Sequence, residues 1–233
     1  MEAITTCCKN CGNLFRGYFC NNCGQKYNIS RITWKEVFHN IPHMLFHLDD
    51  GFFYTIKELF VRPGHTIREY LEGKRKYHFN PFVLLLILAG LCSTLYVYFN
   101  LSTILASISL HKLEEQNEFI AHKFFATRTI IFCLICSVGD YLIFYSHKYN
   151  LAEMVAANVM MFCAVTVLQL SFLPLLLLGQ NLDHLLPIQI TFLVLVMAYL
   201  FYARYQFYEV RGQAKLVLKI VMAILFYLFT FFE

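Results

Sequence analysis

The pattern of hydrophobic and polar positions divides the chain near Pro81. After this residue, long apolar runs alternate with short polar segments. A helix needs ~20 residues to cross a bilayer core about 30 Å thick. The runs therefore predict an all-α polytopic membrane domain over residues 81–233, with about five transmembrane helices. Their expected positions are 81–101, 128–147, 151–178, 185–207 and 214–232.

Between residues 29 and 80, apolar side chains recur at helical spacing along one stripe. Trp34, Phe38, Ile41 and Leu45 belong to the first stripe, which Pro42 interrupts. A second amphipathic stretch follows, and the Arg62-Pro63-Gly64 sequence separates it from a short third helix. Such helices bury one face and leave the other polar. We expect residues 29–80 to form interfacial amphipathic helices on the cytosolic side of the membrane.

The first 28 residues predict a small zinc ribbon. Cys8 and Cys11 form one C-x2-C pair, Cys20 and Cys23 form another, and a glycine follows each pair. The two-residue gap lets both sulfurs of a pair reach one ion, and glycine permits the tight turn that follows. Cys7 is an alternative ligand to Cys8, although the spacing favours Cys8; a redox dithiol is the alternative interpretation. Four thiolates leave no open coordination position, so the expected zinc is structural.

Composition excludes most other classes of protein. Hydrophobic residues make up 58% of the chain and charged residues only 15%, whereas soluble domains have roughly 45–50% and about 25%. The mean hydropathy of +0.54 agrees with a membrane protein. No apolar run in the first 80 residues resembles a secretory signal, so the clustered cysteines indicate a reducing compartment rather than disulfides.

The distribution of positive charge predicts the orientation. Eleven of the 19 Lys and Arg residues precede Pro81. With that end in the cytosol, the inner segments carry 16 of the 19 and the outer segments three. Cytosolic loops are enriched in Lys and Arg. We expect a cytosolic N-terminus and, after five spans, an external C-terminus.

Basic residues before the first span are candidates for contacts with lipid headgroups. A plainer interpretation is that the Pro-Gly pair turns the chain while these residues lie along the anionic inner leaflet. Nucleic acid is not expected as a partner, because the ribbon carries only Lys9, Arg16 and Lys26. The candidate headgroup contacts are Arg62, Arg68, Lys74, Arg75 and Lys76.

Polar residues inside the predicted spans suggest either packing contacts or a pathway. Asp140 in the second span and Asn158 in the third are expected at similar depth, where they can pair across the hairpin. Asn158 and Gln169 are eleven residues apart and share one helix face. We expect these two side chains to form interhelical hydrogen bonds; the alternative is that they line a polar transport pathway.

Three histidines allow a further hypothesis. His39, His43 and His47 recur every four residues, close to Asp49 and Asp50, so they are candidates for a second metal site or an interfacial active site. Histidines on a polar helix face are more often solvated. The sequence contains no H-E-x-x-H, G-x-S-x-G or P-loop motif, so we do not expect an enzyme.

The order of these features resembles an uncharacterised bacterial family of multi-span membrane proteins, a domain of unknown function with an N-terminal zinc ribbon. The resemblance covers the first 81 residues well and implies the ribbon and the topology, but no activity. It therefore implies a location in the bacterial cytoplasmic (inner) membrane. The residues that carry it are Cys8–Gly12, Tyr18–Gln25, Asp49–Gly51, Thr55, Arg62–Gly64, Ile67, Tyr70, Leu71, Gly73–Arg75, Tyr77, Pro81, Tyr149, Leu151 and Glu153.

The sequence thus leaves three classes of function. The first is a non-enzymatic membrane protein whose ribbon and interfacial helices dock a protein partner, or a second copy, as a scaffold at the membrane. The second is a small transporter or channel that uses Asp140 and the Asn158–Gln169 stripe. The third is a lipid-acting membrane enzyme built around the three histidines.

Overall fold

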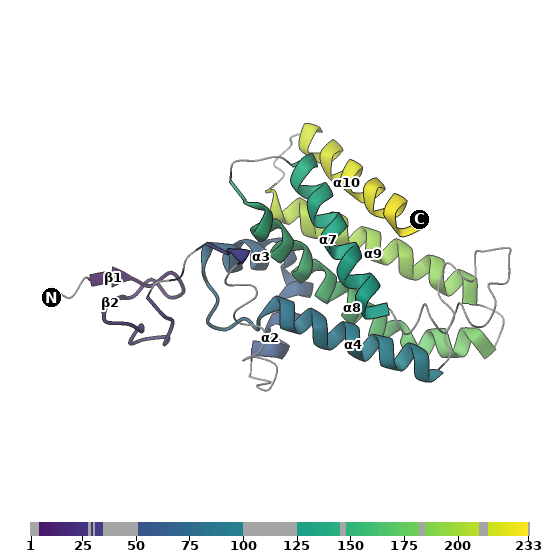
Figure 1. Ribbon diagram of the computed structural model, residues 1–233, viewed down its shortest axis with the longest axis horizontal. Helices are drawn as coiled ribbons and strands as arrows, with labels where there is room; N and C mark the ends of the chain where they lie inside the picture. The colour runs from purple at the N-terminus through teal and green to yellow at the C-terminus, as the bar shows by residue number, and fades with distance from the viewer. Residues whose placement is uncertain are drawn as a thin grey trace.

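The computed structural model describes residues 5–27, 29, 31–34, 51–99, 125–144, 148–181, 185–209 and 214–232. These residues form a two-stranded ribbon and seven helices (Figure 1). The strands are β1 (Thr5–Cys7) and β2 (Leu14–Arg16). The helices are α2 (Gly51–Val61), α3 (Pro63–Glu72), α4 (Pro81–Phe99), α7 (Phe125–Ile143), α8 (Leu151–Asn181), α9 (Leu185–Phe207) and α10 (Ala214–Phe232).

Four helices in the described part are long and apolar enough to cross a membrane, which supports the prediction of a membrane protein. They are Pro81–Phe99, Ala126–Ile143, Leu151–Gly179 and Pro187–Phe207. α10 covers the predicted fifth span, but it is not among these four. The side chains of its last residues, 229–232, lie outside the described part, so a count of five spans stays a prediction.

α8 is the central helix of the bundle. It packs against α4, α7 and α9, and also against the two short helices α2 and α3. Its first half is buried almost without interruption from Ala152 to Ala164. A helix that is apolar on all sides is expected where neighbours surround it. α8 therefore supplies the surface on which the other helices are assembled.

The short helices α2 and α3 close the end of the bundle where α4 begins. The Arg62-Pro63-Gly64 sequence separates the two helices, as predicted. Pro63 is the first residue of α3, a position at which proline is tolerated. Gly64 lies directly against α9: a Cβ at this position would be 2.2 Å from the Phe207 backbone nitrogen. Only glycine permits this close crossing, which holds α3 against the end of α9.

The ribbon lies at the end of the molecule farthest from the transmembrane helices (Figure 1). β1 and β2 pair antiparallel, with Thr6 opposite Phe15. Phe15 is buried in a small cluster with the cysteines. The predicted helix around Pro42, with its three histidines, lies outside the described residues.

Candidate metal centre

Two similar turns position the four predicted ligands. In the first, the Cys8 N–H donates to the Asn13 carbonyl at 2.9 Å, and the Gly12 N–H donates to the Cys8 carbonyl at 2.8 Å. Cys20 and Gly24 repeat the arrangement in the second turn, with the same two distances. Gly12 and Gly24 have φ values of +74° and +69°, a conformation that favours glycine. The glycine after each C-x2-C pair is therefore a geometric requirement.

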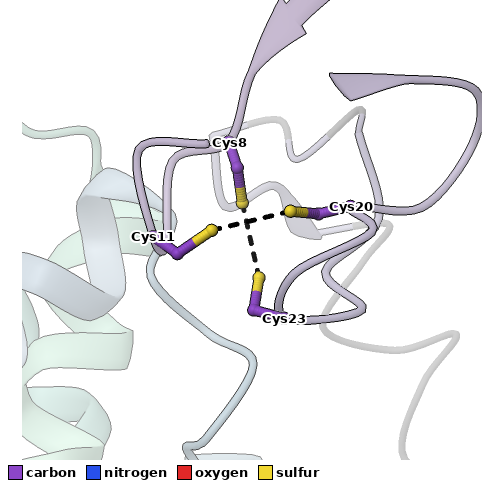
Figure 2. Close-up of side chains that lie close together, drawn as sticks. All are labelled: Cys8, Cys11, Cys20 and Cys23. Atoms are coloured by element: carbon purple, nitrogen blue, oxygen red, sulfur yellow. Dashed lines mark hydrogen bonds between the residues drawn. The ribbon is translucent and has the colours of Figure 1, made fainter. Parts of the chain in front are cut away.

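The four sulfur atoms converge on one point between the turns (Figure 2). All four lie within 4.8 Å of one another. The sulfurs of Cys8 and Cys23 are 3.5 Å apart, as are those of Cys11 and Cys20. Ligands at about 2.3 Å from a tetrahedral ion are separated by roughly 3.8 Å. The cluster therefore has the dimensions to hold one metal ion with no protein ligand missing.

The electrostatics of the thiols agree with a cation-binding role. Burial raises the pKa of the Cys8 thiol to about 11, despite backbone hydrogen bonds from its own turn. Burial also acts on Cys20, but hydrogen bonds from backbone amides and from the Cys11 and Cys8 side chains lower the pKa of its thiol to about 6. Four thiols this close together cannot all ionise without a compensating positive charge. A bound divalent cation supplies that charge and displaces the protons.

Cys7 lies outside this cluster. Its side chain is exposed, and its sulfur is 3.4 Å from the Gly12 carbonyl oxygen. Of the aromatic residues Phe15, Tyr18 and Phe19 in the ribbon, Phe15 packs against the cysteines. Tyr18 is 72% exposed and Phe19 61% exposed.

The ribbon is attached to the loop between α3 and α4. Gln25, which is buried, accepts a hydrogen bond from the Arg75 backbone N–H at 3.3 Å. Gly24 lies against the Lys76 side chain, and Lys9 packs against Gly73. The turns that carry the four cysteines are thus in contact with the segment that leads into α4.

A second attachment joins the linker after the ribbon to the N-terminus of α8. Asn150 and Glu153 cap this helix reciprocally: each side chain accepts the other residue's backbone N–H, at 2.8 and 2.9 Å. The Glu153 carboxylate also receives two hydrogen bonds from the Arg31 guanidinium, at 2.9 and 2.7 Å. This ion pair raises the pKa of Arg31 above its usual value. One buried carboxylate therefore both starts α8 and holds the linker.

Comparison with known proteins finds a match to one segment of the chain. A family model described as Protein of unknown function (DUF3667) matches residues 49–92. No curated protein and no solved structure matches the chain significantly. The match covers α2, α3 and the first part of α4, the region where the sequence resembles a family of unknown function. It does not extend to the ribbon, so the ribbon's place in that family stays a prediction, as does a bacterial origin.

In the matched segment, residues 49–92, several basic side chains bind within the protein. Arg62 pairs with Glu58 and with Glu69, which also receives Lys74 at 2.9 Å. Burial opposes ionisation of Glu69, yet Lys74 and Arg62 lower the pKa of its carboxyl below the usual value. Among the predicted headgroup contacts, Arg62 and Lys74 are therefore already occupied by carboxylates.

Two of the other predicted headgroup contacts, Arg68 and Arg75, also bind within the protein. Arg68 is buried, pairs with Glu209 and lies 2.6 Å from His65 Nδ1. The Arg75 Nε–H donates to the Tyr70 carbonyl at 3.1 Å. Lys76 is exposed but lies beside the ribbon. Because Arg68 is buried and bound to Glu209 and His65, little of its guanidinium is left for a lipid.

Within the bundle, Asp140 forms an ion pair with an arginine of α9. Arg204 of α9 is completely buried, and its Nη2 donates to Asp140 Oδ2 at 2.7 Å. The same nitrogen lies 3.4 Å from Asn158 Oδ1, which accepts a shorter bond of 2.6 Å from the Tyr227 hydroxyl. Among the described residues, Asp140 therefore reaches Asn158 only through Arg204. This buried charge cluster, Asp140, Asn158, Arg204 and Tyr227, joins α7, α8, α9 and α10.

Two other predictions concerned Gln169 and the three histidines. Gln169 donates to the Tyr96 hydroxyl of α4 at 3.1 Å, so it binds a different neighbour from Asn158 on the same helix. The proposed second metal site of His39, His43 and His47, with Asp49 and Asp50, lies outside the described residues.

Sequence reasoning missed Arg204 and Arg31 as structural partners. Arg204 is three residues from the end of α9, where a positive residue usually reaches the interface. A signal was present nonetheless, because a lone acidic residue in a span requires a partner of opposite charge. Arg31 had no comparable signal, since its partner lies 122 residues away.

Proposed function

We propose that this chain is a non-enzymatic integral membrane protein whose cytosolic zinc-ribbon head docks a protein partner at the inner face of the membrane. The observation that carries the proposal is the exposed apolar surface of the ribbon. Phe19 and Tyr18 are largely exposed, and Leu14 on β2 is 67% exposed. An apolar surface on so small a domain is typical of a protein interaction site.

The position of this surface supports a protein partner rather than lipid. The ribbon lies at the far end of the molecule from α4, α7, α8, α9 and α10 (Figure 1). With the bundle in the membrane, the ribbon projects away from the bilayer. The loop contact at Arg75 and the ion pair at Glu153 hold it in that position.

The metal centre is proposed to be structural zinc. Four thiolates are a donor set typical of structural zinc, and they leave no open position at which a substrate can bind. Within a domain this short, ion binding supplies most of the folding free energy. The ion thereby presents the exposed aromatic residues in one arrangement.

The remaining parts of the proposal concern the membrane. We place the chain in the bacterial inner membrane with five spans, α10 being the fifth, a cytosolic N-terminus and an external C-terminus. The division into a ribbon over 1–28, interfacial helices over 29–80 and a transmembrane domain over 81–233 belongs to the same proposal. It rests on the distribution of Lys and Arg and on the apolar runs.

The geometry gives less support to a transport pathway. Arg204 neutralises Asp140, and Asn158 accepts a bond from Tyr227, so this group is engaged in joining helices. Gln169 binds α4 instead of continuing the same polar line. The docking function is therefore the better supported of the two.

Photo-crosslinking in cells tests the docking function. A photoreactive phenylalanine analogue placed at Tyr18 or Phe19 should yield one discrete crosslinked protein. The same analogue at Asn22, which is exposed on the second turn, is the matched control. The product should disappear in the Cys20→Ser background, where the ribbon loses its ion. Crosslinking that is absent at Tyr18 and Phe19, or equally strong at Asn22, would overturn the proposal.

A further inference from the structure

The outer face of α2 carries large apolar side chains that no described part of the protein covers. Phe53, Lys57 and Val61 recur every four residues and therefore lie on one side of the helix. Phe53 is 78% exposed and Val61 60% exposed, whereas Thr55 and Leu59 on the opposite side are fully buried. α2 thus has a packed face toward the protein and an apolar face directed away from it.

The loop before α4 extends this face. The Tyr54 and Tyr77 rings meet edge to face, with centroids 6.2 Å apart, and Tyr77 is 54% exposed. The Phe79 backbone N–H donates to the Thr55 hydroxyl at 2.8 Å, which fixes the loop against α2. Phe53, Tyr54, Lys57, Val61 and Tyr77 therefore form one continuous surface, the α2 surface.

The α2 surface lies beside the entry of the first transmembrane helix. Tyr77 precedes Pro81, the first residue of α4, by four residues, so it lies within about 14 Å of the start of this span. Figure 1 shows α2 next to the beginning of α4, and the Phe52 and Phe79 rings meet between them. At that level, a side chain that points outward meets the boundary between headgroups and acyl chains.

The composition of the α2 surface matches this boundary. Tyrosine is enriched at membrane interfaces, where its ring lies among apolar groups and its hydroxyl remains hydrated. Lys57 has no ion-pair partner within the described residues, whereas Arg62 and Lys74 of the same segment are paired with carboxylates. A long lysine side chain can cover apolar surface while its ammonium reaches anionic headgroups.

We infer that the α2 surface is a lipid-binding surface that inserts Phe53 and Val61 into the inner leaflet beside α4. Lys57 contacts the anionic headgroups, and Tyr54 and Tyr77 lie at their level. This assigns lipid contact to a different set of residues from the basic cluster around Arg62, whose charges are used within the protein. The inference does not depend on the ribbon having a protein partner.

Fluorescence quenching by brominated lipids tests the inference with the full chain in anionic vesicles. Replacing the single tryptophan, Trp34→Phe, removes the background emission. In that chain, the Phe53→Trp variant should be quenched most by lipids brominated near the headgroup. A Leu91→Trp variant is the deep reference, because Leu91 is exposed ten residues into α4, about 15 Å along the helix. It should be quenched most by lipids brominated near the chain ends.

A Tyr18→Trp variant on the ribbon is the matched control for exposure without membrane contact. It should respond to a water-soluble quencher and to none of the brominated lipids. The inference is overturned if the Phe53→Trp variant behaves like the ribbon control. It is also overturned if this variant responds to neither class of quencher, since another protein segment or a second copy would then cover the α2 surface. Melting curves that match those of the Trp34→Phe chain show that the variants fold.

Discussion

Arg204 is the residue whose surroundings matter most for the stability of the bundle. Its guanidinium is fully buried, pairs with Asp140 and lies over the Tyr227 ring at 4.5 Å. Within the described residues, Asp140 Oδ1 and Arg204 Nε have no hydrogen-bond partner. The two side chains therefore form an ion pair, but in the described part of the chain each keeps one buried polar atom without a hydrogen bond. A pair of this kind contributes specificity more surely than net stability, and losing one partner is costly.

The first prediction is a double-mutant cycle at this pair. Arg204→Leu leaves a buried carboxylate without its cation and should lower the free energy of unfolding by about 3 kcal/mol. Adding Asp140→Leu removes the second charge and should recover most of that loss. Thermal unfolding in mild detergent measures both effects. Lys215→Leu, at an exposed position of α10, is the control and should have little effect. Additive losses from the two leucine substitutions would show that the residues are not coupled.

At the scale of the element, the ribbon has almost no core, so an ion at the four cysteines would supply most of its folding free energy. Phe15 is the only non-cysteine residue in its buried cluster within the described part of the head. The second prediction is that purified protein contains about one zinc ion per chain and that Cys20→Ser loses it. Hydrogen exchange over residues 5–27 should then increase, while the bundle keeps its melting temperature.

Cys7→Ser is the matched control for this substitution. Cys7 is a neighbour of the ligands in sequence, but its sulfur lies outside the cluster. Elemental analysis should find the same zinc content as in the unmodified chain. Equal loss of zinc in both variants, or its retention after Cys20→Ser, would refute the four-cysteine site.

The junction of α2 with the loop before α4 should respond to pH through His78. This imidazole touches Thr55 and the Tyr54 and Tyr70 rings. Burial lowers its pKa, the nearby Glu58 and Glu69 act in the opposite direction, and Arg62 adds to the lowering. The net effect is a folded-state pKa below the usual value of about 6.5.

The third prediction follows from the sign of this shift. The unfolded chain binds the proton more readily, so the stabilisation from neutral His78 is complete above pH 6.5. It is lost as the pH falls through the lower, folded-state pKa. Melting temperatures between pH 7.5 and 5 should fall less steeply for His78→Gln than for the unmodified chain. Parallel curves would show that His78 does not titrate as described.

At the scale of the whole molecule, the orientation of the chain in the membrane determines which of its surfaces face the cytosol. The ribbon, α2, α3 and the N-terminus of α8 lie at one end, joined by the bonds at Arg75 and Glu153. Positive residues accumulate at this end, and cytosolic segments are enriched in such residues. All surfaces proposed for docking and inner-leaflet contact therefore belong to the same side.

The fourth prediction concerns this topology. Reporters inserted after Lys148 and Arg211 should be active in the cytosol, whereas those after Glu115 and Asp183 should be active outside. A chain ending in a C-terminal reporter should place it outside if α10 crosses the membrane. A cytosolic signal at the C-terminus would remove the fifth span and leave four. A cytosolic signal at Glu115 would contradict the whole arrangement.

The sequence by itself determined the local features of this protein. The spacing of Cys8, Cys11, Cys20 and Cys23 predicted the cluster, because two residues between thiols and a following glycine are local geometric requirements. The apolar runs predicted the positions of the long helices within a few residues, and the Pro63-Gly64 break was correct. Each of these features depends on residues a few positions apart, so the local sequence is enough to predict it.

Only the tertiary structure decided which distant residues meet. Arg204 turned inward because α7, α8 and α10 bring Asp140, Asn158 and the Tyr227 ring to its guanidinium. Glu153 acquired Arg31, and Gly64 its contact with α9, from packing between segments far apart in the chain. The exposure of Phe19 and Phe53 was likewise not readable from periodicity. An apolar side chain is covered or left to a partner according to what the fold brings beside it, which local pattern does not specify.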